Sequence, residues 1–178
     1  MEGARGGMKR LLFVMFLLSA LAVAANAQEN PVAWSAICSA KSVHPGQKFS
    51  AKVSAQITSG WHIYSITQAP GGPTPTEITL AAKQPFTLSG FVIGPLPHSS
   101  YDENFQLETD TYERTAAFKV PIAVAAKAPS GASAVAIDVR FQACNDRNCL
   151  PAKTIHLSAP VRITAAGTLS RNPTEPKP

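Results

Sequence analysis

Two cysteines, Cys144 and Cys149, are the residues of this 178-residue sequence whose spacing most directly suggests chemistry. The segment between them, Asn145-Asp-Arg-Asn148, is rich in Asn and Asp, which favour turns. If this segment closes a hairpin-like loop, the two side chains face each other at the roughly 3.5–4.5 Å Cβ separation that a disulfide needs. The pair is therefore expected to form a bridge without large backbone movement. Phe141 continues the inward alternation of the preceding strand, so Cys144 is predicted to point outward.

Such a bridge has a structural and a redox interpretation. The chain-entropy model gives about 2 kcal/mol for a loop of about six residues, against about 4.7 kcal/mol for one of about 100 residues. A bridge of this spacing is thus a weak staple, and exposure at a loop would let a foreign thiolate attack it. Arg147 would favour a thiolate and Asp146 would oppose it, so the neighbouring charges set no direction for reactivity. The spacing alone leaves both roles open.

Metal binding is a third interpretation of the cysteines. Four intervening residues exceed the commonest two-residue spacing of zinc knuckles, and no second Cys or His pair is close in sequence. No metal site and no cofactor are predicted. The histidines are dispersed along the chain, at His44, His62, His98 and His156.

The elements that would position the cysteines are strands. Apolar residues alternate with polar ones in several segments, a period of two that is typical of strands with one face on a core. The pattern covers residues 48–57, 118–124 and 135–141, with further strands at 32–34 and 155–163 and shorter candidates at 61–64 and 77–80. No amphipathic helix is predicted after the N-terminal region. Many short strands with frequent turns favour an all-β, antiparallel sandwich.

Proline and glycine mark the turns between these strands. His44-Pro-Gly-Gln47 is a predicted turn, in which Pro presets φ and Gly tolerates the left-handed conformation. Residues 69–75 contain several Pro and Gly and are predicted to form no regular element, and residues 129–131 separate two strands.

The N-terminal region has the order of a secretory signal peptide. A stretch with three basic residues up to Arg10 is followed by the apolar run 11–24 and by Ala25-Asn-Ala27. The run has 14 residues, short of the roughly 20 that a membrane-spanning helix needs. We therefore expect cleavage after Ala27, a periplasmic product without stable membrane insertion, a domain over residues 28–165 and a disordered tail over 166–178.

The charge pattern gives no sign of nucleic-acid binding. The chain has 16 basic and 11 acidic residues, and removal of residues 1–27 would take away three basic and one acidic residue and leave a net charge of +3. The remaining charges are scattered, which is typical of a solvated surface. No nucleic-acid partner is expected.

Five pieces of the sequence, taken in order, resemble a known family. They are Gly60-Trp-His-Ile-Tyr-Ser65, Gly71-Gly-Pro-Thr-Pro-Thr76, Tyr101-Asp-Glu-Asn-Phe105, Phe118-Lys-Val-Pro121 and Phe141 to Thr154, which contains both cysteines. Together they span about residues 32–163. The ordered set is similar to the N-terminal periplasmic domain of the bacterial thiol:disulfide interchange protein DsbD, an immunoglobulin-like β-sandwich that shuttles reducing equivalents.

The resemblance implies roles for individual residues. Cys144 and Cys149 match the catalytic pair, with Cys144 as the leading sulfur. Asp102, Glu103, Asn104 and Phe105 match a cap loop over the disulfide, in which Phe105 is the shielding ring. An apolar lid of this kind would block adventitious thiols and open when a partner docks. Tyr64 matches an aromatic near the site, whose hydroxyl would orient a sulfur or an acidic neighbour. For Tyr64 and Phe105, ordinary core packing is the alternative.

The sequence also departs from the family pattern. His62 stands where the best-known member has an aromatic, so the resemblance supports no histidine role, and the cysteine spacing is one residue shorter. The full-length family form continues into a membrane-embedded redox domain and a thioredoxin-like domain, and neither is recognised in this sequence. The implied partners are therefore a separate membrane-embedded thiol reductant and periplasmic thioredoxin-like or disulfide-isomerase-like proteins.

Two further expectations complete the sequence-based picture. Cys38 shares the alternating phase of Val32 and Trp34, so it is predicted to be a buried thiol that packs as a small hydrophobe. The competing function is a non-catalytic sandwich module that binds a partner through its loops and carries a structural disulfide.

Overall fold

The computed structural model describes residues 30–165, which form strands joined by turns and contain no helix. The chain divides after Asn30 into two units, and the strands all belong to the second. The strands are β1 (Val32–Cys38), β2 (Ser42–Val43), β3 (Lys48–Ile57), β4 (His62–Tyr64), β5 (Glu77–Leu80), β6 (Phe86–Leu88), β7 (His98–Asp102), β8 (Leu107–Glu113), β9 (Thr115–Val124), β10 (Gly131–Phe141), β11 (Ala143–Cys144) and β12 (Lys153–Ile163).

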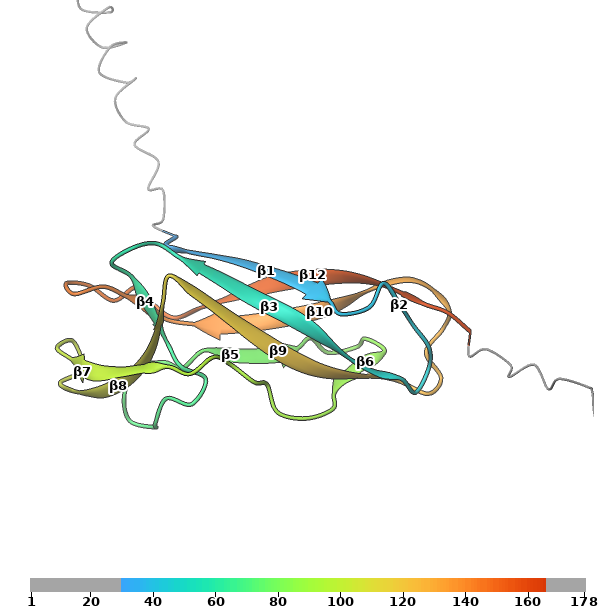
Figure 1. The fold of residues 1–178 in the computed structure, drawn as a ribbon, viewed down its shortest axis with the longest axis horizontal. Coiled ribbons are helices and arrows are strands. Elements are labelled where there is room, and N and C mark those ends of the chain that lie inside the picture. The colour runs from blue at the N-terminus through green and yellow to red at the C-terminus, as the bar shows by residue number, and fades with distance from the viewer. Residues whose placement is uncertain (1–29, 166–178) are drawn as a thin grey trace, which may run out of the picture. The chain divides into compact units, whose positions relative to one another are not determined.

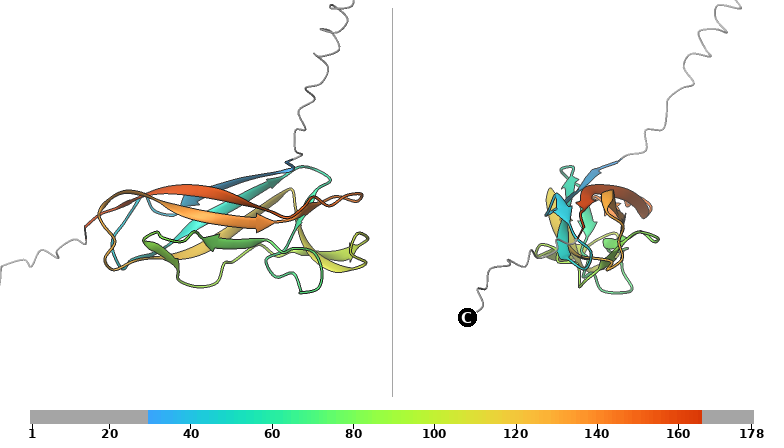
Figure 2. Two further views of the ribbon diagram at one scale, coloured as in Figure 1. Left: turned by 180° about the vertical axis from the view of Figure 1, so that it is seen from behind. Right: turned by 90° about the vertical axis from the view of Figure 1, so that its right-hand side faces the viewer.

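Three four-stranded sheets form the domain. One has the order β1-β3-β9-β6 and a second has the order β2-β12-β10-β5, and these two make the layers of the sandwich (Figures 1 and 2). The third, β11-β4-β8-β7, lies at one end of the layers (Figure 1). All strand pairs are antiparallel except the short β2–β12 pair. The predicted immunoglobulin-like antiparallel sandwich is confirmed.

The core lies between the two layers and follows from the alternation along the long strands. In β3 and β9, Val53 faces Phe118 across the pair, and both side chains are almost fully buried. Trp34 of β1 packs against Phe118 and Phe141, with ring centroids 6.1 and 5.2 Å apart. The aromatic and β-branched side chains thus fill the interior, while the polar residues between them face out.

Most predicted strands and turns are confirmed. The long alternating segments correspond to β1, β3, β9, β10 and β12, and the shorter candidates correspond to β4 and β5. Residues 69–75 form no strand, and the turn 44–47 has Gly46 at φ 79° with the Gln47 N–H donating to the His44 carbonyl at 3.0 Å. The hairpin of β7 and β8 was not predicted, because most of its buried positions are polar: Asp102, Thr109 and Thr111 are buried there, with Tyr112 as the aromatic exception.

The proposed signal peptide, residues 1–27, and the proposed tail, residues 166–178, lie outside the described residues. Within residues 30–165, no helix has the length and apolar character needed to cross a membrane.

Candidate functional site

Cys144 and Cys149 are joined by a disulfide, as their spacing predicts. Strand β10 ends at Phe141, and the chain then leaves its sheet to form β11, which pairs with β4 so that Cys144 lies opposite His62. The Asn145 side-chain oxygen accepts the backbone N–H groups of Arg147 and Asn148, at 2.9 and 2.8 Å. This Asx-type turn closes the loop and brings the two cysteines side by side.

The two sulfur-bearing residues differ in exposure. Cys144 is fully buried and Cys149 is partly exposed. The prediction that Cys144 points outward is wrong. The chain changes sheets at Gln142, so the alternation of β10 does not continue into β11, and both residues of β11, Ala143 and Cys144, are buried. Since Cys149 is the more accessible residue, the burial does not favour Cys144 as the leading sulfur.

Tyr64 and Asp102 form a buried hydrogen bond beside the disulfide. Tyr64, at the end of β4, donates its hydroxyl to Asp102 Oδ2 at 2.7 Å, and Asp102 Oδ1 accepts the Asn104 N–H at 2.8 Å. The Tyr64 hydroxyl also lies 4.0 Å from Cys149 Sγ. Burial, followed by the bond to Asp102 and its charge, raises the pKa of Tyr64 far above its ordinary value. The hydroxyl therefore stays protonated, and it donates its single hydrogen to Asp102 while lying beside the sulfur.

His62 belongs to the same cluster, a role that the sequence resemblance does not supply. Its Nε2 lies 3.3 Å from the Tyr64 hydroxyl and 3.8 Å from Asp102 Oδ2. Burial lowers the pKa of His62, while the negative charges of Asp102, Glu113 and Asp146 oppose this shift. The signal for this placement is in the sequence, since His62 and Tyr64 are two residues apart in a strand and share a face.

The predicted cap loop is the turn of the β7–β8 hairpin. Gln106, with φ 56°, donates its N–H to the Asp102 carbonyl at 2.7 Å and closes the turn. The half-buried ring of Phe105 meets the Tyr64 ring edge-on, with centroids 5.8 Å apart, and Glu103 and Asn104 are exposed. Asn104 Nδ2 donates to the Asn145 carbonyl at 3.2 Å, so the hairpin turn is tied directly to the disulfide loop. The structure thus places all of the predicted site residues in one cluster.

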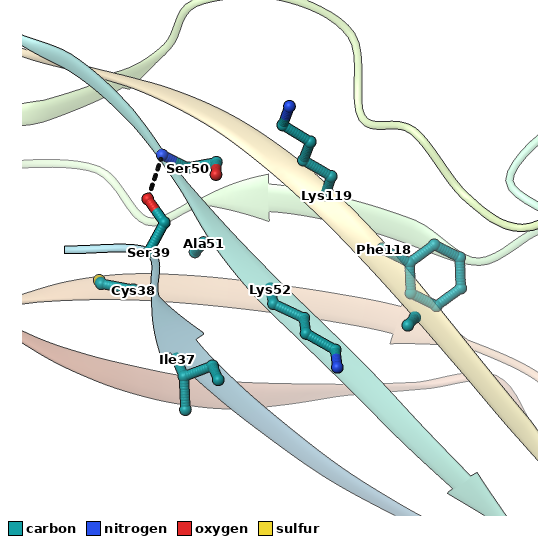
Figure 3. A pocket seen from close by; sticks show the side chains of 9 residues that line it. Ile37, Cys38, Ser39, Ser50, Ala51, Lys52, Phe118 and Lys119 are labelled. Atoms are coloured by element: carbon teal, nitrogen blue, oxygen red, sulfur yellow. Dashed lines mark hydrogen bonds between the residues drawn. The ribbon is translucent and has the colours of Figure 1, made fainter.

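Cys38 lies apart from this cluster, at the end of β1. Its thiol is half-buried and lies 3.6 Å from the Ala159 carbonyl of β12, and burial raises its pKa. Figure 3 shows Cys38 at the edge of a shallow groove over β1, β3 and β9, where Ser39 accepts the Ser50 N–H at 3.2 Å. Cys38 packs against the core as a small hydrophobe, but the predicted burial is only partial, because the residue lies at the edge of its sheet.

A sequence model of the family described as "Thiol:disulfide interchange protein DsbD, N-terminal" matches residues 29–159 of the chain. The chain belongs to this family. No curated protein matches the chain. As a DsbD N-terminal domain, it carries its disulfide within the matched residues.

Two solved structures match most of the described part of the chain. The N-terminal periplasmic domain of ScsB from Proteus mirabilis is 15% identical, with a TM-score of 0.51 over 74% of this chain and 47% of that chain. The reduced DsbD N-terminal domain from Neisseria meningitidis is 16% identical, with a TM-score of 0.45 over 70% of this chain and 82% of that chain. At these identities, the ScsB match supports the fold of this DsbD N-terminal domain, and this chain spans about half of that protein.

Proposed function

We propose that this protein relays reducing equivalents through Cys144 and Cys149 to other exported proteins by thiol–disulfide exchange. The observation that carries the proposal is a disulfide with one partly exposed cysteine, set beside a buried Tyr64–Asp102 pair and under the tip of a hairpin. Membership in the DsbD N-terminal family supports the same reaction. A staple would need none of these neighbours.

The exchange proceeds in two balanced steps. In the reduced protein, the thiolate of Cys149 attacks one sulfur of a partner's disulfide, which breaks that S–S bond, releases one partner thiolate and forms a mixed disulfide. The Cys144 thiolate then attacks Cys149 Sγ, re-forms the intramolecular bond and releases the second partner thiolate. Two electrons pass to the partner, and the two protons lost by the cysteines balance those taken up by the partner thiolates. Cys149 leads because it is the partly exposed cysteine.

The residues around the sulfurs support this sequence of events. The Tyr64 hydroxyl lies 4.0 Å from Cys149, and its single hydrogen, which Asp102 accepts in the disulfide form, would stabilise a developing thiolate by turning from Asp102 toward the sulfur. The hairpin turn 102–105 acts as a cap that limits access by unrelated thiols and moves when the proper partner docks. Asp102 is held by its buried bond to Tyr64, whereas residues 103–105 meet the rest of the site through the Asn104–Asn145 hydrogen bond and the Phe105–Tyr64 ring contact, so movement of this tip alone breaks few interactions.

The proposed setting is the bacterial periplasm. Residues 1–27 would act as a cleaved signal peptide, residues 28–165 as the working domain and residues 166–178 as a disordered tail. A membrane-embedded thiol reductant would supply electrons, and periplasmic thioredoxin-like or disulfide-isomerase-like proteins would receive them. The description of the ScsB neighbour as a periplasmic domain supports this location.

Trapping of the mixed disulfide tests the proposal. In a Cys38→Ala background, Cys144→Ser leaves Cys149 without a resolving partner, so this variant should accumulate a covalent adduct with an oxidised thioredoxin-like protein. The matched variant Cys149→Ser should accumulate far less adduct. Adduct formation with neither variant, under conditions in which the oxidised partner reacts with dithiothreitol, would favour a binding module with a structural bridge.

A further inference from the structure

A polar pocket of about 200 Å³ lies between the cap hairpin and the disulfide loop. The residues of its lining that bear on its chemistry are His62, Asp102, Glu103, Thr109, Glu113 and Asp146. They come from β4, β7, β8, the hairpin turn and the loop between the two cysteines. We call this cavity the acidic pocket.

Three of the four carboxylates that line the acidic pocket, those of Glu103, Glu113 and Asp146, are on exposed side chains. Within residues 30–165, the ion pairs are His62–Asp102 and His156–Asp138, so Glu103, Glu113 and Asp146 are in no salt bridge with a Lys or Arg. Negative charges gathered in a cavity repel each other and attract a cation. Asp102 differs from the other three carboxylates, because Tyr64 and Asn104 donate hydrogen bonds to its oxygens.

A second and independent observation concerns Thr109, which is 2% exposed. Among the described residues, Trp34 Nε1 and Thr109 Oγ1 are the buried side-chain polar atoms that have no hydrogen-bond partner. Thr111, two residues further along β8, donates its hydroxyl to the His98 carbonyl. A buried hydroxyl without a hydrogen-bond partner lowers the stability of the fold unless another group forms a hydrogen bond with it. Thr109 lines the acidic pocket, and its Oγ1 is covered in the free protein, so an occupant with N–H donors would supply the missing partner after a small movement of this side chain.

The chemistry of the lining selects the class of occupant. Carboxylates together with a hydroxyl acceptor suit a group with several N–H donors and a positive charge, which in proteins is an ammonium or guanidinium. No group of three or more His, Cys, Asp or Glu side chains in residues 30–165 is arranged to hold a metal ion. The pocket adjoins the disulfide through Asp102, whose partner Tyr64 contacts Cys149.

We propose that the acidic pocket receives a Lys or Arg side chain that lies near the reactive cysteine of the redox partner. This inference rests on the exchange function proposed above and defines the kind of partner that fits. A cation in this position aligns the partner's disulfide with Cys149, speeds association by electrostatic attraction and disfavours partners with an acidic rim.

Small disulfides of different charge test the proposal on the intact mature protein. The reduced protein is mixed with cystamine, which carries two ammonium groups, with neutral bis(2-hydroxyethyl) disulfide, and with dianionic 3,3′-dithiodipropionate. Each rate is divided by the rate of the same disulfide with dithiothreitol, which removes differences in intrinsic reactivity. At low salt we expect the normalised cystamine rate to exceed the neutral one by about tenfold, within the range of electrostatic rate effects. The preference should shrink in about 1 M NaCl, where the Debye length is about 3 Å.

Two double variants distinguish an effect of the pocket carboxylates from an effect of the protein's net charge. Glu113→Gln with Asp146→Asn removes two pocket carboxylates and should abolish most of the cystamine preference. Glu77→Gln with Asp138→Asn removes the same charge from β5 and β10, outside the pocket, and should preserve the preference. An equal loss in both double variants would overturn the proposal, because the attraction would then come from the net charge.

The variant Thr109→Val tests the hydroxyl without changing the charge. We expect it to lower the cystamine preference several-fold and to leave the melting temperature unchanged or higher, since the hydroxyl has no partner in the free protein. An unchanged preference together with a lower melting temperature would show a structural role and contradict the proposal. If all three disulfides react at equal normalised rates, the pocket proposal fails while exchange stands; if none reacts, the exchange function itself fails.

Discussion

The middle of the sandwich and its disulfide end are built from different kinds of buried residue. In the middle, Val53, Phe118 and Ile137 are almost fully buried and contact other apolar side chains. At the disulfide end, the polar residues Asp102 and Thr109 are buried, and Tyr64 is buried with its hydroxyl bonded to Asp102. Apolar burial stabilises the fold without constraining chemistry, whereas each buried polar group at the end needs a partner and holds a donor or acceptor in place. Stability and function are therefore expected to respond separately to substitution.

The largest expected effect compares two phenylalanines, one from each region. Phe141→Ala removes a core ring that packs 5.2 Å from Trp34, and should lower the free energy of unfolding by about 3–5 kcal/mol. Phe105→Ala removes the half-buried ring of the cap and should cost about 1 kcal/mol or less. Denaturant unfolding measures both changes.

The reactivity of the same two variants should show the reverse order. Loss of the Phe105 ring should let small thiols reduce the disulfide several-fold faster, because access to Cys149 increases. Phe141→Ala should leave this rate unchanged under conditions in which the variant is folded. If Phe105→Ala leaves the rate of reduction unchanged, the Phe105 ring does not shield the disulfide.

A smaller effect is expected from Tyr64→Phe, which deletes only a hydroxyl. The substitution leaves Asp102 Oδ2 buried without its 2.7 Å donor, and should lower the free energy of unfolding by about 1–3 kcal/mol. The matched control is Tyr101→Phe, because Tyr101 is 53% exposed and adjoins Asp102 in β7; it should change stability by about 0.5 kcal/mol or less. Equal stability of the two variants would show that the buried bond contributes nothing net.

The smallest effect concerns the pH dependence of stability. Because burial lowers the pKa of His62 in the folded protein, the unfolded chain binds more protons below about pH 6.5, so stability falls as the pH decreases through this range. The loss levels off once the pH is below the folded pKa. Denaturant unfolding between about pH 7.5 and 5 should show a steeper loss for the wild type than for His62→Gln, with His44→Gln as the exposed control. Parallel curves for all three proteins would contradict the burial argument.

The sequence predicts the middle of the sandwich well, because its strands alternate apolar and polar residues with a strict period. The same rule fails at the disulfide end. Strands β7 and β8 were not predicted, since Thr109 and Thr111 occupy buried positions that the rule assigns to apolar residues. The burial of Cys144 was also not predicted, because alternation along β10 carries no information about the change of sheet at Gln142.

The candidate site was predictable in its parts but not in its connections. The Asn-rich segment indicates the turn that closes the disulfide loop, and the family resemblance indicates Tyr64 and the turn 102–105. The pairing of His62 with Glu113 and Cys144 depends on register across three strands, which local patterns do not specify. The acidic pocket likewise assembles from segments far apart in the chain.

The reduction potential of the Cys144–Cys149 pair tests the central claim most directly. It can be measured by equilibrating the mature protein, in a Cys38→Ala background, with glutathione or dithiothreitol buffers and quantifying the free thiols. An exchange protein should give a value between about −270 and −120 mV, the span of known thiol–disulfide exchange proteins. A value below about −300 mV, typical of structural disulfides, would contradict the account.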